Sequence, residues 1–309
     1  MDLDDIVRNV VLNEDIHALL TDILEGRALR EHPFKKLVEF QRDAYAREGL
    51  CIKKEGFQVG EPWDGDIANA RVAFISSNPA FDAIEDFPRY HAETRTLSTP
   101  DGSTLSLSDA KDFFKYRFQR ACVSPNGALL RKRRDGCRAV NYWGCVRNSM
   151  EALWPDAACP GDSREVYVKR LMSKAVTMEI VPFKSSGEKG VSEALLICMK
   201  IFTRHILPHV AAPIIVLVGK KVRSAFLYLA TETEEEWRNA ERIFDNQEAY
   251  HYNGPLCSGK KLVVSVGFNA GQFSKLANLV SLVSLVSLVN DCTDSTMREL
   301  QAVFCNDVK

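Results

Sequence analysis

The chain has 309 residues, of which 46% are hydrophobic and 26% are charged, and its formal net charge is −1. This composition supports a sizeable hydrophobic core and excludes a mainly disordered chain. The near-zero net charge excludes a basic surface over the whole molecule, so any nucleic-acid site has to be local.

The nine cysteines are odd in number, scattered and without a C-x-x-C pair. This pattern favours reduced thiols over a disulfide framework, a zinc site or an iron–sulfur site. The start of the chain, MDLDDIVRNVV, is acidic and lacks the basic and apolar segments of a signal peptide. No run reaches the roughly 18 apolar residues of a membrane span. We therefore expect a cytoplasmic protein that uses no metal, no cofactor and no membrane.

The first part of the chain is predicted to be helical. Apolar residues recur at three- and four-residue spacing in DDIVRNVVLNEDIHALLTDILEG and in HPFKKLVEFQRDAYAREG, and both segments end at Gly. We expect residues 1–58 to form a helical N-terminal extension. The main domain is then expected at 59–309.

Four short, β-rich apolar runs follow, and a helical pattern comes after each. Continuous apolar runs of this length are typical of parallel strands that are buried on both faces. The pattern predicts a three-layer α/β/α sandwich with a central, mainly parallel four-stranded sheet, plus the N-terminal helices. The strands are expected at 72–76, 176–182, 214–219 and 262–267, and the helices at 142–153, 191–209, 222–230 and 272–289.

A long insertion is predicted at about 92–138. It contains a helical segment, LSLSDAKDFFKYRFQRAC, and the compact basic run Arg131-Lys132-Arg133-Arg134. A short basic run is usually a solvated loop, but it can also contact a nucleic-acid backbone. We keep both interpretations, with Arg131, Arg133 and Arg134 as candidate DNA contacts.

Polar side chains follow each predicted strand, where parallel sheets bind ligands. Pro79 favours an extended Asn78, so that the amide of Asn78 projects at the carboxyl edge of the sheet. Glu179 lies near the end of the second strand, and Asn269 follows the fourth. The remaining candidates could face phosphates: Lys184, Ser185, Ser186, Lys189 and, at a helix start, Lys220.

Several familiar sites are excluded by their missing motifs. The chain has no G-x-x-x-x-G-K-[ST], no G-x-G-x-x-G and no G-x-S-x-G. His205 and His209 have helical spacing, but Pro208 lies between them. We interpret them as surface or helix-end histidines and not as metal ligands.

The order of the strand-end segments, VAFISSNPAF, TMEIVPFKSSGEKGV, PIIVLVGKKVRSAF and LVVSVGFNAGQ, resembles the uracil-DNA glycosylase superfamily. The Asn-Pro segment is similar to that of its mismatch-specific branch. The resemblance covers roughly residues 60–290. It implies a monofunctional glycosylase that removes a flipped base from duplex or single-stranded DNA and leaves an abasic site.

The resemblance also implies roles for individual residues. Asn78 matches the position that orients the attacking water, and Phe87 or Tyr90 matches the aromatic that stacks on the base, with Phe81 nearby. Glu179 falls near the base-reading position, and the Lys184–Ser186 segment matches a loop that holds the DNA backbone. The last motif usually presents His-Pro, whereas this chain has Gly267-Phe268 followed by Asn269.

Without this histidine, other side chains have to supply the catalytic groups. Asp82 or Glu85 could stabilise the sugar cation or accept the proton of the water. A carboxylate at Glu179 would accept a hydrogen bond from an amino group such as cytosine N4. This suggests that the substrate is a modified cytosine in foreign (phage) DNA. The other interpretation is that Glu179 forms a structural salt bridge. Uracil repair, a silent nucleic-acid-binding module and an enzyme of free nucleotides or RNA remain alternatives.

Overall fold

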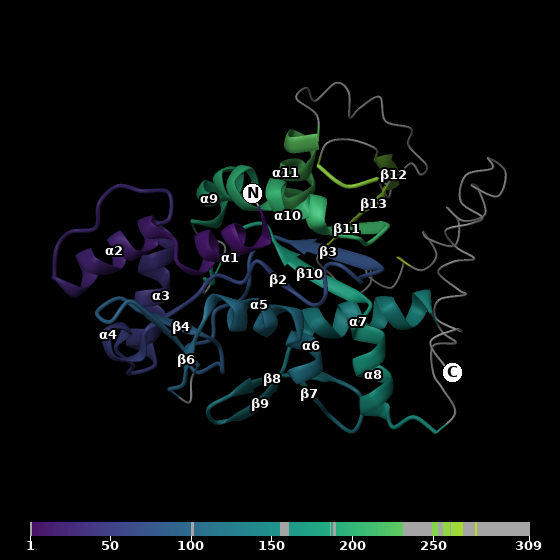
Figure 1. Ribbon diagram of the computed structural model, residues 1–309, viewed down its shortest axis with the longest axis horizontal. Coiled ribbons are helices and arrows are strands. Elements are labelled where there is room, and N and C mark those ends of the chain that lie inside the picture. The colour runs from purple at the N-terminus through teal and green to yellow at the C-terminus, as the bar shows by residue number, and fades with distance from the viewer. Residues whose placement is uncertain are drawn as a thin grey trace.

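The computed structural model describes residues 2–99, 102–154, 161–185, 187, 190–230, 249–252, 256–259, 261–267 and 276. The fold is mixed α/β, with helices and several sheets (Figure 1). The described helices are α1 (Leu3–Val11), α2 (Glu14–Leu24), α3 (Lys35–Arg47), α4 (Ile52–Glu55), α5 (Leu107–Lys115), α6 (Arg117–Arg120), α7 (Asn141–Leu153), α8 (Arg164–Met172), α9 (Val191–Cys198), α10 (Arg204–Ile206) and α11 (Lys220–Ala230).

The central sheet has six strands in the order β12-β13-β11-β3-β10-β2. The inner strands β3 (Val72–Ser76), β10 (Ala175–Glu179), β11 (Ile214–Val218) and β13 (Lys261–Val266) run parallel, as the apolar runs predict. The expectation of a four-stranded sheet is corrected by two antiparallel edge strands, β2 (Trp63–Asp64) and β12 (Ala249–Tyr252). Both edge strands are short and lack an apolar run, which explains why the sequence pattern does not reveal them.

Each face of the sheet packs against its own hydrophobic cluster. Ala73 and Ile75 of β3 belong to the cluster on the side of α9 and α11, whereas Val72 and Phe74 belong to the cluster on the side of α7 and α8. Successive side chains of a strand point to opposite faces, so a strand buried on both faces has to be apolar throughout. This requirement produces the continuous apolar runs in the sequence.

The N-terminal helices share the first of these clusters. Ile6, Val10 and Leu19 are buried together with Ile75 and Met178 of the sheet. Two caps define the helix starts, because the side chains of Asp2 and Asn13 accept hydrogen bonds from backbone N–H groups in the first turns of α1 and α2. The predicted extension therefore packs on the sheet as part of one core, and the domain boundary at residue 58 stays a prediction.

The predicted insertion builds two small sheets and two helices. β4 (Arg89–His91), β5 (Thr96–Ser98) and β6 (Thr104–Leu105) join β1 (Phe57–Gln58) in one antiparallel sheet. The predicted helical segment forms α5 and α6. β7 (Cys122–Val123), β8 (Leu129–Arg133) and β9 (Gly136–Ala139) form the other sheet. Most of the basic run thus lies in β8 and not in a loop, which corrects the sequence-based expectation.

The predicted helix at 191–209 is one helical stretch of changing pitch. α9 passes into a π-helical turn at Met199–Thr203, then into α10 and a 3-10 turn at Leu207–His209. The helix predicted at 272–289 lies outside the described residues except for residue 276. None of the described helices has the length and apolar character that a membrane crossing needs.

Candidate functional site

A pocket of about 530 Å³ lies where the four parallel strands end. It is lined by Ser76 at the end of β3, Glu179 at the end of β10, Val218 at the end of β11 and Gly267 directly after β13. The pocket thus brings together residues at or directly after the ends of all four parallel strands. Its volume is typical of sites that enclose a small molecule or one extruded group.

Asn78 lines this pocket and is held by the loop that follows the neighbouring strand. Its Nδ2 donates to Ser185 Oγ at 2.9 Å and to the carbonyl of Pro79 at 3.2 Å. The backbone of the two loops is also paired, because Phe81 N donates to the carbonyl of Ser185 at 3.1 Å. Asn78 is therefore fixed on a doubly anchored loop, and Ser185 acts as its support.

Glu179 is a buried carboxyl at the wall of the pocket. Ser76 Oγ donates a hydrogen bond to it from the adjacent strand. Burial, together with the negative charge of Glu61, raises the pKa of Glu179 to about 8. The group is therefore mostly protonated at neutral pH, with one O–H donor and remaining acceptor capacity. In this form Glu179 would also donate a hydrogen bond, which the sequence-based interpretation as a carboxylate does not include.

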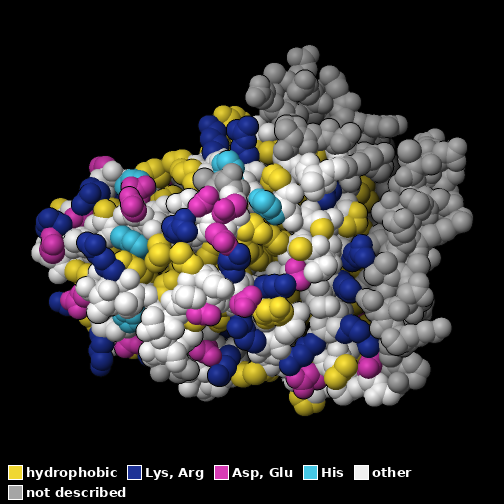
Figure 2. Space-filling model, in the orientation of Figure 1, with side chains coloured by type: hydrophobic (Ala, Val, Ile, Leu, Met, Phe, Trp, Pro, Cys, Tyr) yellow, Lys and Arg dark blue, Asp and Glu magenta, His cyan; other side chains and the backbone are white. Residues whose placement is uncertain are grey.

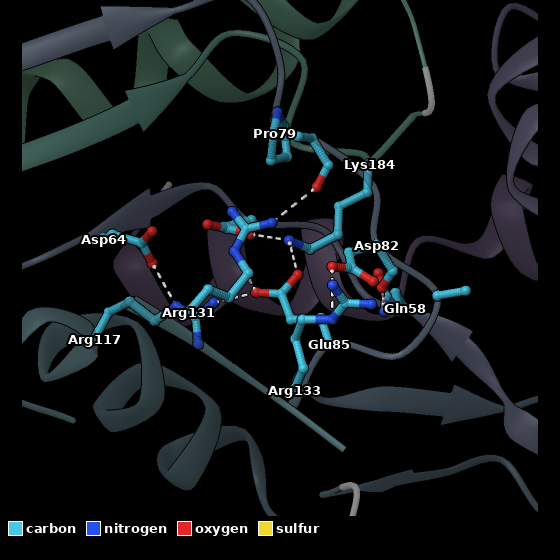
Figure 3. Close-up of polar contacts among 12 residues, drawn as sticks. Gln58, Asp64, Pro79, Asp82, Glu85, Arg117, Arg131, Arg133 and Lys184 are labelled. Atoms are coloured by element: carbon cyan, nitrogen blue, oxygen red, sulfur yellow. Dashed lines mark hydrogen bonds and ion pairs between the residues drawn. The ribbon is translucent and has the colours of Figure 1, made fainter. Parts of the chain in front are cut away.

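A buried ion cluster includes Arg131 and Glu61 of the pocket lining, and Figure 3 shows its contacts around Glu85. Glu85 is fully buried and pairs with Arg131 Nε at 2.9 Å, with Lys184 Nζ at 3.2 Å and with Arg117. Lys184 is equally buried and also binds Glu61. Removing one partner of such a cluster usually costs about 3–5 kcal/mol, since it leaves a buried charge without compensation. The cluster therefore holds Arg131 and Glu61 in place at the pocket.

Glu61 and Asp64 form a coupled pair at the edge of this cluster. Burial disfavours the charge on Glu61, but Lys184 and a hydrogen bond with Asp64 outweigh it and hold the pKa of Glu61 well below its usual range. Burial and the charge of Glu61 raise the pKa of Asp64 well above its usual range. Asp64 thus keeps the proton, and Glu61 presents an ionised carboxylate to the pocket.

The basic run is largely neutralised by acidic neighbours. Arg131 binds Glu85, Arg133 binds Asp82 at 3.3 Å, and Arg134 binds Glu55 at 2.8 Å. Basic and acidic side chains are also interspersed over the described part of the face in Figure 2. The run is therefore a set of ion pairs along one strand and not a free basic patch.

Several predicted site residues lie away from the pocket lining, which corrects their proposed roles. Phe87 is fully buried against Phe113 and Phe114. Tyr90 stacks on His17 with ring centroids 3.8 Å apart, and Phe81 packs on Tyr45. Asp82, Glu85 and Lys184 are engaged in the contacts described above. The buried Lys184 cannot reach a DNA backbone.

The pocket lining retains Asn78, Glu179, Ser185, Lys220 and Arg131 from the predicted set. Ser186, Lys189 and Asn269 lie outside the described residues. The lining adds residues that sequence reasoning passed over, namely Glu61, Ser76, Tyr142, Trp143 and Lys221. The only sequence signal for Tyr142 and Trp143 was their place at the start of a predicted helix, and Glu61 lies in a turn-rich bridge.

Among the described residues, no group of three or more His, Cys, Asp or Glu side chains is arranged to hold a metal ion. No protein-family model matches the chain. A search of curated proteins gave no match either. The assignment of a function therefore depends on the geometry of the pocket and on the sequence resemblance.

Proposed function

We propose that the chain is a monofunctional DNA N-glycosylase, which hydrolyses the bond between a flipped-out base and its sugar and leaves an abasic site. The observation that carries the proposal is the pocket at the carboxyl ends of four parallel strands, with Asn78 held in it by Ser185. A pocket of about 530 Å³ is large enough for one extruded base. The finer fold class, a three-layer α/β/α sandwich of the uracil-DNA glycosylase type, belongs to this proposal.

The proposed chemistry needs a placed water and negative charge near a cation-like sugar, but no metal. Nδ2 of Asn78 is already bound, and Oδ1, which accepts one hydrogen bond from Ser77 Oγ at 3.4 Å, has a second lone pair with which it would orient the water. Glu61 is the candidate for the electrostatic role expected of Asp82 or Glu85, because this ionised carboxylate lines the pocket while it is also paired with Lys184. Its negative charge would stabilise the developing sugar cation.

The walls of the pocket fit a pyrimidine. Tyr142 and Trp143 offer aromatic surface, while Glu179 in its protonated form offers a donor and an acceptor side by side. Neutral cytosine presents an acceptor and a donor at N3 and N4, and uracil presents a donor and an acceptor at N3 and O4. A protonated carboxyl complements both edges, so modified cytosine in phage DNA and uracil are both candidate substrates.

The test is base release from duplexes that carry uracil, cytosine, hydroxymethylcytosine or glucosylated hydroxymethylcytosine, followed by alkali cleavage of abasic sites. We expect strand breaks at one of these bases with the native chain. We expect Asn78→Ala and Glu61→Gln each to lower the rate at least about 100-fold, the usual scale for a lost catalytic group. Asn69→Ala, in an exposed turn, is the matched control and should keep the native rate.

One observation favours a second function, a catalytically silent nucleic-acid-binding module. Within the described part of the pocket lining there is no histidine, and Asp82 and Glu85 are bound elsewhere. Tight DNA binding without release of any of the four bases would support this module and contradict the glycosylase. Loss of DNA binding altogether would contradict both.

A further inference from the structure

Two cysteines lie against each other at the three-stranded sheet beside the pocket. Cys122 is in β7 and Cys137 is in β9, on either side of β8, and their sulfur atoms are 3.2 Å apart. Cys137 is exposed and Cys122 is partly exposed, so small oxidants in solution can reach the pair. The other described thiols, Cys51, Cys145, Cys198 and Cys257, have no such sulfur partner in the described part of the chain.

The surroundings of the pair distinguish its two sulfurs. The Cys137 thiol donates its hydrogen bond to Cys122 Sγ, and this bond raises the pKa of Cys137. Lys132, which is opposite Cys137 on β8, places its positive charge near both sulfurs. Cys137, whose S–H points at the other sulfur, is placed to resolve a product formed on Cys122.

We propose that Cys122 and Cys137 form an oxidation-sensitive dithiol site, which a peroxide converts to a disulfide between β7 and β9. Cys122 thiolate attacks one peroxide oxygen, forms a sulfenic acid and releases hydroxide, which becomes water. Cys137 then attacks the sulfenic sulfur, and its thiol proton leaves with the displaced hydroxide as a second water. Two thiols are thus oxidised by two electrons and one hydrogen peroxide is reduced to two waters. Bond formation needs the sulfurs to move from 3.2 Å to about 2.05 Å apart, and because β8 lies between the two strands it also needs β7 and β9 to move toward each other.

The disulfide would act on the wall of the pocket. β8 lies between the two cysteines and carries Arg131, while β9 leads directly to Val140 and Tyr142. A covalent link across β8 ties β7 to the segment that precedes α7. We therefore expect oxidation to reduce local opening of β8 and of the start of α7. This inference does not depend on the proposed glycosylase activity.

The test treats the full chain with hydrogen peroxide, blocks remaining thiols with iodoacetamide and maps tryptic peptides by mass spectrometry. Trypsin separates the two cysteines, because Cys122 falls in ACVSPNGALLR and Cys137 in DGCR. We expect these two peptides to become linked with the loss of two hydrogens, and dithiothreitol to separate them. Cys51, an exposed thiol elsewhere, is the internal control and should stay alkylated at the same peroxide dose.

Two variants and a second measurement complete the test. In Cys137→Ser, we expect dimedone to trap a sulfenic acid on Cys122; in Cys122→Ser, we expect Cys137 to react no faster than Cys51. Alkylation of both native cysteines at a dose that already oxidises Cys51 would overturn the proposal. Hydrogen exchange then compares the oxidised and reduced chains over residues 129–142. Equal exchange would overturn the link to the pocket wall.

Discussion

At the scale of single residues, the environment of a side chain decides its chemistry more than its type does. The position of Asn78 at the pocket can be predicted from the sequence. Pro79 restricts the backbone of Asn78, and the strand pattern places Asn78 at the edge of the sheet. The protonation of Glu179 cannot be predicted from the sequence, since it depends on burial and on Glu61, which is far away in the chain but close in the fold. The ion pairs that remove Glu85 and Lys184 from the pocket come from residues far apart in the chain. Local patterns carry no information about such contacts.

Glu179 leads to a prediction about pH. Its pKa is about 8 in the folded chain and close to the ordinary 4.5 in the unfolded chain, so the folded state binds more protons between these values. The free energy of unfolding should therefore decrease as pH rises through this range, by at most about 4 kcal/mol at pH 8 from this one group. Glu179→Gln should lose this dependence, whereas Glu48→Gln at an exposed site should keep it. Urea unfolding at several pH values between 5 and 8.5 measures the effect, and parallel curves for Glu179→Gln and the native chain would contradict it.

At the scale of elements, the basic run shows how tertiary contacts alter a sequence-based interpretation. The run predicts a solvated loop or a nucleic-acid contact, but Arg131, Lys132 and Arg133 lie in β8 and each of them forms an ion pair. The parallel strands β3 and β11 were located within one residue, because burial on both faces produces an unmistakable apolar run. The two-residue strands β1 and β2 could not be located in this way, since such short segments have no period to detect.

The ion pairs of β8 predict a weak dependence of DNA binding on the basic run. The side chain of Lys132 is 67% exposed and pairs with Asp86 at 3.2 Å, whereas the other three cations are more buried. Lys132→Ala should lower the salt slope of DNA binding by about one phosphate contact. The triple variant Lys132→Ala, Arg133→Ala, Arg134→Ala should lower the salt slope by little more than Lys132→Ala alone. Fluorescence anisotropy with a DNA duplex over a salt series measures the slope, with Lys54→Ala as the control. A slope that falls by about three phosphate contacts in the triple variant would contradict the prediction.

At the scale of the whole molecule, the N-terminal helices share one hydrophobic cluster with one face of the sheet. A β-carbon added at Gly60, just before β2, would meet a methyl carbon of Val10 at 2.5 Å, so α1 lies directly against the main domain. Sequence periodicity reveals the apolar faces of these helices but not the surface that covers them. For this reason the helices were expected as an accessory extension, although they bury residues of the sheet.

The shared cluster predicts that the described fold unfolds as one cooperative unit. Leu19 in α2 is fully buried, and Leu19→Ala should lower the free energy of unfolding by about 2–5 kcal/mol, because it removes packed methyl groups and leaves a cavity. The loss should shift a single transition seen both by helix circular dichroism and by tryptophan fluorescence. Leu196→Ala, at a site that is 45% exposed in α9, is the control and should change the stability by less than about 0.5 kcal/mol. The opposite result would be a circular dichroism transition that moves to milder unfolding conditions in Leu19→Ala while the tryptophan fluorescence transition stays in place. The N-terminal helices would then be an independent domain, and the single cooperative unit would be contradicted.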